Sequence, residues 1–178
     1  MNPIVFDKPL LGFAAFSGTG KTTLLVKLLP LLRQTGLRVA MIKHAHHQFD
    51  VDKPGKDSYE LRKAGASPML ISSSRRLALM IDHDEEREPD LQELLSYLNP
   101  AAIDLVLVEG FKQWPFDKIE LHRPTLDKPL MFPEDRHIIA IAHDGELPNR
   151  PEMPRLDLNN TEQIAQFVLD YCKQKTAS

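Results

Sequence analysis

A short segment near the N-terminus combines glycine, lysine and threonine at the spacing of a phosphate-binding loop. Residues 15–23 read Ala-Phe-Ser-Gly-Thr-Gly-Lys-Thr-Thr, between the apolar run 10–16 and a leucine-rich stretch that begins at Leu24. The G-x-x-x-x-G-K-[ST] pattern needs a strand before it and a helix after it, because backbone N–H groups and the helix N-terminus together cradle phosphate oxygens. Both flanks meet that requirement, so the segment predicts a site for a polyphosphate.

The residues of this loop have distinct expected roles. Lys21 should reach the β- and γ-phosphates, and the Thr22 hydroxyl is placed to ligate Mg²⁺. Ala15 replaces the first glycine of the pattern, and alanine is the smallest substitute. A Gly-Thr-Gly turn opening an ordinary helix is the alternative, but it leaves the adjacent Lys-Thr pair unexplained. The predicted nucleotide-binding residues are Ser17, Gly18, Thr19, Gly20, Lys21, Thr22 and Thr23.

Carboxylates that could complete a magnesium site come from two other segments. The buried run 103–108 stops at Glu109, and strand carboxyl ends meet the ligand crevice of an open α/β sheet. A solvent-facing glutamate opening a loop is the alternative. Asp50 and Asp52 follow a second predicted strand and could ligate Mg²⁺ or orient attacking water. We therefore predict Thr22, Glu109, Asp50 and Asp52 as metal ligands, and Lys21, Glu109 and Asp50 as catalytic residues.

Other polar clusters give weaker signals. His44, His46 and His47 lack an accompanying cysteine and are too compact for a closed tetrahedral site, so phosphate contacts or a plain polar loop are favoured over a transition metal. Asp144 stands where a base reader could be, but its loop is equally a simple turn, and no Asn-Lys-x-Asp motif occurs. From the residues alone, the ligand is a nucleoside triphosphate of undefined base.

Composition sets the class of protein. With 178 residues and a net charge of -3, the chain fits one domain and lacks the basic footprint of a nucleic-acid binder. The N-terminal apolar run is too short for a membrane span and lacks the flanks of a signal peptide. The single cysteine, Cys172, cannot form an internal disulfide. We expect a cytoplasmic protein without nucleic-acid or membrane partners.

The pattern of elements predicts an α/β fold. A strand over 10–16, a helix from Leu24 that Gly36 ends, and a strand over 38–43 form a βαβ unit. We expect a P-loop NTPase-like, mostly parallel sheet with helices on both faces, forming a single nucleotide-binding domain over 1–178. Further predicted strands cover 103–108, 118–122 and 137–142, and a β-hairpin covers 69–72 and 77–81.

Three further helices are predicted from capping residues and apolar spacing. One opens at Asp57, taken as the N-cap of a capping box with Glu60, and ends at Gly65. A second covers residues 90–98, and Asn160 or Thr161 caps a final helix.

Three segments together resemble the MobB family, the GTP-binding adapter proteins of molybdopterin-guanine dinucleotide biosynthesis. They are the loop over 15–23, the stretch Ile-Lys-His-Ala-His-His over 42–47 that runs into 50–66, and Leu-Val-Glu-Gly-Phe-Lys over 107–112. The resemblance spans the chain from the first strand to about Ala142. It implies a dimer that binds GTP with Mg²⁺, hydrolyses it slowly and assists the guanylyltransferase MobA, with molybdopterin or a molybdoenzyme as further partners.

Slow hydrolysis agrees with the sequence, since no well-marked glutamine or arginine finger is present. Two alternatives stay open. A small P-loop kinase would need an acceptor pocket and an arginine-bearing lid, and the arginines here are scattered. A non-catalytic interaction module would use the nucleotide only to set a conformation that a partner recognises.

Overall fold

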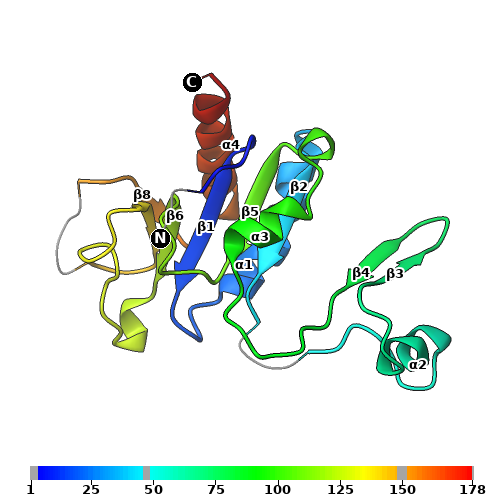
Figure 1. Ribbon diagram of the computed structural model, residues 1–178. Coiled ribbons are helices and arrows are strands. Elements are labelled where there is room, and N and C mark those ends of the chain that lie inside the picture. Colours follow the sequence, from blue (N-terminus) through cyan, green and yellow to red (C-terminus); the bar gives the residue numbers. More distant parts are fainter. Residues whose placement is uncertain (1–3, 46–48, 148–151, 178) are drawn as a thin grey trace. The chain divides into compact units, whose positions relative to one another are not determined.

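The chain forms two compact units in a computed structural model that describes residues 4–45, 49–147 and 152–177. The sheet unit comprises Met1–His44 and Asp90–Ser178, and the hairpin unit comprises Ala45–Pro89. Figure 1 follows the chain through both. Among the described residues, no helix is long and apolar enough to cross a membrane.

A six-stranded parallel sheet organises the sheet unit, with the order β2-β5-β1-β6-β7-β8. This arrangement confirms the predicted α/β class with a mostly parallel sheet. The last strand was not predicted, because it is only three residues long and buries a single side chain, Leu156. The strands are β1 Leu10–Ala15, β2 Val39–Lys43, β5 Leu105–Glu109, β6 Lys118–His122, β7 Ile138–His143 and β8 Arg155–Asp157.

Helices cover both faces of this sheet, as predicted. The helices α1 Lys21–Gln34 and α4 Thr161–Ala177 pack on the face that carries Leu11 and Phe13. The short helix α3 Leu91–Ser96 packs with Leu10 and Val106 on the other. In Figure 1, α3 crosses in front of β5 and α4 lies behind β1. Because neighbouring residues of a buried strand face opposite sides, β1, β2 and β5 contribute apolar side chains to both cores. Among the described residues, β6, β7 and β8 contribute only to the core under α1 and α4.

The strand β6 buries polar side chains on one of its faces. Lys118 is 1% exposed, and its ammonium donates to the carbonyls of Lys112 and Trp114 and pairs with Asp135 at 2.9 Å. Glu120 is fully buried and accepts hydrogen bonds from the amides of Met131 and Phe132, while burial raises the pKa of its carboxyl. These side chains fasten the irregular segments on either side of β6 to the sheet.

The pairing of β6 with β7 contains a β-bulge. Lys118 lies opposite Ile138, but Ile119 lies opposite Ala140, so Ile139 is one extra residue on β7. Beyond the bulge the pairing is regular up to His122 and His143, the last residues of the two strands.

The hairpin unit contains the helix α2 Asp57–Lys63 and two antiparallel strands, β3 Met69–Ser72 and β4 Leu77–Met80. The predicted hairpin is therefore confirmed. The predicted N-cap was wrong by one residue, since Lys56 caps α2 and Asp57 already lies inside it. The Glu60 carboxylate accepts from the amide of Gly55, so it satisfies a donor before the helix instead of closing a capping box with Asp57. At the other end of the chain, Asn160 caps α4 by accepting from the amide of Gln163.

Candidate functional site

The predicted phosphate loop lies between the end of β1 and the start of α1. Gly18 and Gly20 have φ values of 83° and 92°, which is the left-handed region that glycine adopts without strain. Gly20 is the N-cap of α1 and no side chain caps that helix. A Cβ added to Gly18 would meet no atom within 4 Å, so the space beside this part of the loop is open. The first amides of α1 can therefore bind an anion.

The Thr19 side chain turns inward instead of toward the open space. It is 2% exposed, and its hydroxyl donates to the carbonyl of Phe16 at 2.8 Å. This hydrogen bond closes the loop on itself. Thr19 thus contributes loop shape through its side chain, while its backbone remains part of the predicted cradle.

Lys21 and Glu109 meet at the carboxyl edge of the sheet. The Lys21 ammonium lies 3.2 Å from one carboxylate oxygen of Glu109, and the Lys43 ammonium lies 3.7 Å from the other. Glu109 ends β5, next to β1 on one side and opposite Lys43 of β2 on the other. Its side chain is 12% exposed. The structure therefore brings the predicted lysine and the predicted carboxylate together.

The donors around the loop fit Mg²⁺ held with a nucleotide. Thr22 is exposed in the first turn of α1, and Glu109 supplies a carboxylate at the neighbouring strand end. The described residues contain no cluster of three or more His, Cys, Asp or Glu side chains that could hold a metal by itself. Mg²⁺ commonly uses one or two protein carboxylates, several waters and substrate phosphates. The Thr22 hydroxyl and the Glu109 carboxylate are protein ligands of this kind.

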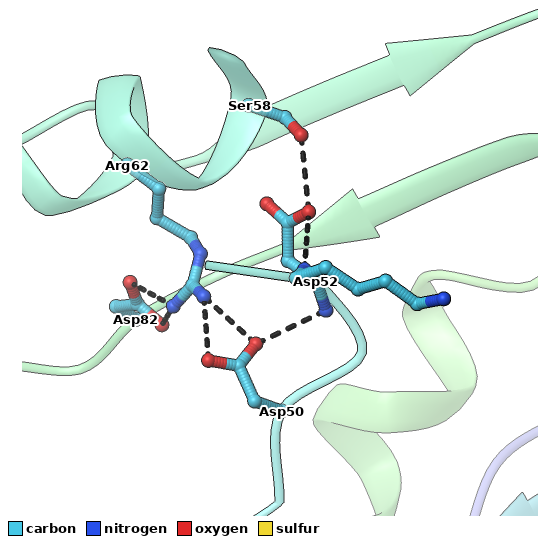
Figure 2. A network of polar contacts seen from close by, with 6 residues as sticks. Asp50, Asp52, Ser58, Arg62 and Asp82 are labelled. Atoms are coloured by element: carbon cyan, nitrogen blue, oxygen red, sulfur yellow. Dashed lines mark hydrogen bonds and ion pairs between the residues drawn. The ribbon is translucent and has the colours of Figure 1, made fainter. Parts of the chain in front are cut away.

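The Asp50 carboxylate is paired with an arginine of the same hairpin unit. Both of its carboxylate oxygens accept from Nη2 of Arg62, at 2.8 and 2.9 Å, while Nη1 of Arg62 binds the Asp82 carboxylate. Figure 2 shows Arg62 between these two aspartates. A hydrogen bond from the amide of Asp52, followed by the bond from Arg62, lowers the pKa of Asp50. Asp50 is therefore a charged structural partner inside this unit.

Asp52 retains one oxygen for a further ligand. Its Oδ1 accepts from the amide of Lys53 and from the Ser58 hydroxyl (Figure 2). Its Oδ2 is buried and has no hydrogen-bond partner among the described residues. Asp50 and Asp52 belong to the hairpin unit, whereas Thr22 and Glu109 belong to the sheet unit. A shared Mg²⁺ shell for all four residues stays a prediction.

The histidine segment is only partly described. His46 and His47 lie outside the described residues. The ring of His44 lies 5.1 Å from the ring of Phe111, and its amide donates to the carbonyl of Glu109. His44 thus extends the pairing of β2 with β5 by one hydrogen bond.

Arg123 is a site residue that sequence reasoning missed. It follows β6, and its Nε donates to the carbonyl of Thr19 at 2.8 Å. Its Nη1 pairs with the Asp144 carboxylate after β7, and its Nη2 approaches Asn159 at 3.4 Å. One guanidinium therefore connects the phosphate loop to two segments on the far side of β6. The sequence offered one signal for Arg123, a cationic side chain directly after the predicted strand over 118–122.

A polar pocket of about 450 Å³ opens beside Asp144. It lies at the carboxyl ends of β7 and β8 and at the start of α4, and its volume is typical of a small-molecule site. Within it the Asp157 carboxylate accepts from the amide of Asn159, and the Gln163 side chain accepts from the amide of Asp157. The lining residues are His143, Asp144, Gly145, Arg155, Leu156, Asp157, Asn159 and Gln163.

The same fold occurs in proteins of known family. Residues 10–144 match the family described as MobB, molybdopterin guanine dinucleotide synthesis protein B. The chain is 49% identical over 168 residues to a molybdopterin-guanine dinucleotide biosynthesis adapter protein of Escherichia coli, covering 94% of this chain and 95% of the relative. An adapter protein of the same description from Haemophilus influenzae is 44% identical over 161 residues, covering 90% and 87%.

Solved structures have the same fold as this chain. A crystal structure of molybdopterin-guanine biosynthesis protein B superposes with a TM-score of 0.72 at 29% identity, over 92% of this chain and 99% of that one. The structure of Bacillus subtilis MobB gives 0.67 at 22% identity, over 92% and 97%, which shows the fold alone. The family match and the two adapter relatives are the stronger finding. The chain therefore belongs to the MobB family.

Proposed function

We propose that this chain is a cytoplasmic, GTP-binding and weakly GTP-hydrolysing adapter protein of molybdopterin-guanine dinucleotide biosynthesis, and that residues 1–178 act as one nucleotide-binding domain. The observation that carries the proposal is Lys21 held on Glu109 beside a glycine loop at the uncapped start of α1. The two adapter relatives support the biosynthetic role.

The triphosphate would lie over the loop from Ser17 to Thr23. Its oxygens replace Glu109 as the partner of the Lys21 ammonium and accept from the first amides of α1. Thr22 and Glu109 would hold Mg²⁺, and we propose Asp50 or Asp52 as a further ligand. Bound Mg²⁺ neutralises charge on the phosphate oxygens.

The pocket beside Asp144 is our candidate for the base. β7 is two strands away from β1, so its carboxyl end lies about 10 Å from the phosphate loop. Arg123 spans this interval, because it contacts both Thr19 and Asp144. Guanine offers adjacent N–H donors, and the carboxylates of Asp144 and Asp157 are acceptors of the kind that reads them.

The hairpin unit offers a surface for protein partners. Leu70 and Leu79 lie opposite each other in the β3–β4 ribbon and are 59% and 44% exposed, and Leu77 shares their face at 65%. An isolated two-stranded ribbon is marginally stable, and a face of exposed leucines is typical of an interface. We propose that this face joins two copies of the chain, and that the dimer assists a MobA-type guanylyltransferase, with molybdopterin or a molybdoenzyme as further partners.

The central experiment is calorimetric titration of the chain with GTP and Mg²⁺. Lys21→Ala should weaken binding about 10-fold or more, because a hydrogen bond from a charged group to phosphate is lost. Lys27→Ala, an exposed lysine of α1, is the matched control and should leave the affinity unchanged. Equal binding by Lys21→Ala and the parent chain would overturn the proposal.

A non-catalytic module remains the second candidate, because the relatives are described as adapters. Pull-down of a MobA-type guanylyltransferase in the presence of GDP, and separately of a non-hydrolysable GTP analogue, separates this module from the GTP-hydrolysing adapter. A switch requires different partner affinities in the two nucleotide states. Equal capture in both states argues against a switch.

A further inference from the structure

A second lysine lies beside the phosphate loop. The ammonium of Lys112 lies 5.0 Å from the ring centroid of Phe16, the first residue after β1. This distance is within the range of a cation–π contact. Lys112 forms no ion pair with a carboxylate among the described residues, whereas Lys21 and Lys43 share Glu109. Lys112 therefore adds a third ammonium group to those of Lys21 and Lys43, and it has no carboxylate partner of its own in the described part of the chain.

The turn before Lys112 has an unusual backbone conformation. Gly110 and Phe111 have φ values of 96° and 52°, two consecutive left-handed residues directly after Glu109. A Cβ at Gly110 would lie 2.6 Å from the Cβ of His44, so no larger residue fits without a shift. A positive φ is uncommon for phenylalanine, and such residues cluster at functional sites.

Packing from two sides keeps this turn in place. The Phe111 ring is buried and contacts the rings of His44, at 5.1 Å, and Trp114, at 6.1 Å. In addition, the buried ammonium of Lys118 donates to the carbonyl of Lys112 at 3.0 Å. The backbone of Lys112 is therefore anchored while its side chain remains exposed at the loop.

The charges around Lys112 favour an anion. Although Lys112 is exposed as a residue, its ammonium is partly desolvated, and this desolvation, followed by the nearby charge of Lys21, lowers the pKa of the ammonium. The two cations repel each other, and a polyanion bound between them would remove that repulsion. A terminal phosphate bound by Lys21 would relieve that repulsion, and this is the group that distinguishes GTP from GDP.

We propose that Lys112 is a second phosphate-binding cation, which contacts the terminal phosphate of the bound nucleotide and makes the chain prefer the triphosphate over the diphosphate. The inference rests on the proposed function, because it needs a nucleotide on the loop. It assigns to Lys112 a role that the loop pattern alone gives only to Lys21.

The test is the ratio of GTP to GDP affinity, measured calorimetrically with Mg²⁺. Lys112→Gln should weaken GTP binding about 10-fold and GDP binding much less, so the ratio falls by nearly the same factor. Lys112→Arg keeps the charge and should retain most of the preference. Lys27→Gln is the matched control for net charge and should leave the ratio unchanged.

The outcomes separate this inference from the proposed function. If the parent chain binds no GTP, the proposed function fails. If the parent chain binds GTP, and Lys112→Gln weakens the binding of GTP and GDP equally or leaves both unchanged, only the role of Lys112 is overturned. Thermal melting checks that each variant is folded. Lys112→Met, which keeps the apolar stem over Phe16, replaces Lys112→Gln if that variant unfolds.

Discussion

Replacing Arg123 by glutamine should loosen the predicted phosphate loop, because this guanidinium fastens the loop to the segments that follow β7 and β8. The variant loses the donor to the Thr19 carbonyl and leaves the Asp144 carboxylate without its cation. Thr19 is buried, so water does not readily replace the lost donor. We expect both lower stability and weaker nucleotide binding.

The magnitude follows from the contacts. The Arg123 and Asp144 side chains are 29% and 17% exposed, so their ion pair is partly shielded from water. A hydrogen bond between charged groups contributes about 1.5 to 3 kcal/mol, and solvent exposure places this pair toward the lower end. The bond to Thr19 adds about 1 kcal/mol, while the 3.4 Å approach to Asn159 contributes little. The sum is about 2 to 3 kcal/mol.

The assay is a double-mutant cycle in urea with Arg123→Gln, Asp144→Asn and the double variant. The two residues should couple by about 1 to 2 kcal/mol, because each single change removes the same ion pair. Arg136→Gln, an exposed arginine outside the site, is the control and should cost little. Strictly additive effects, or an Arg123→Gln chain as stable as the control, would refute the connection.

Two further predictions concern the turn before Lys112 and the single cysteine. Gly110→Ala should lower stability by about 2 kcal/mol more than Gly36→Ala in chemical unfolding, since both glycines have φ near 90° but only a Cβ at Gly110 meets another residue. Equal losses would mean that His44 moves aside freely. Burial, followed by the charge of Asp104, raises the pKa of the Cys172 thiol to about 11, so an aromatic disulfide reagent at pH 8 should modify the native chain far more slowly than the urea-unfolded chain. Rapid native labelling would contradict this environment.

Short-range patterns were enough to predict the glycine loop between β1 and α1, while its binding of phosphate stays a prediction. The order Gly18, Gly20, Lys21 specifies a turn, a helix start and a cation within one local segment, and neighbouring residues suffice to form it. The strand ending at Glu109 was equally readable, because a parallel strand buried on both faces is an uninterrupted apolar run. The hairpin followed from two short apolar runs joined by polar residues.

Residues whose role depends on strand order were not predictable in this way. Arg123 reaches Thr19 because β6 lies beside β1, and Lys112 reaches Phe16 because β5 lies on the opposite side. Neither adjacency is written in the spacing of the residues along the chain. The Asp57 cap was misjudged because the chain turns into α2 one residue earlier than the capping motif suggests.

The extra residue on β7 has a consequence for the site at the other end of that strand. Ile139 is the extra residue of β7 and lies opposite the step from Lys118 to Ile119. Beyond it His122 pairs with His143, so the next residues of the two chain segments, Arg123 and Asp144, lie level with each other. Had the strands stayed in the register that they have at Lys118, His143 would stand level with Arg123, and a shift by one residue reverses the side to which every later side chain points. One extra, partly buried residue near the start of β7 thus decides whether an aspartate or a histidine lies level with the arginine.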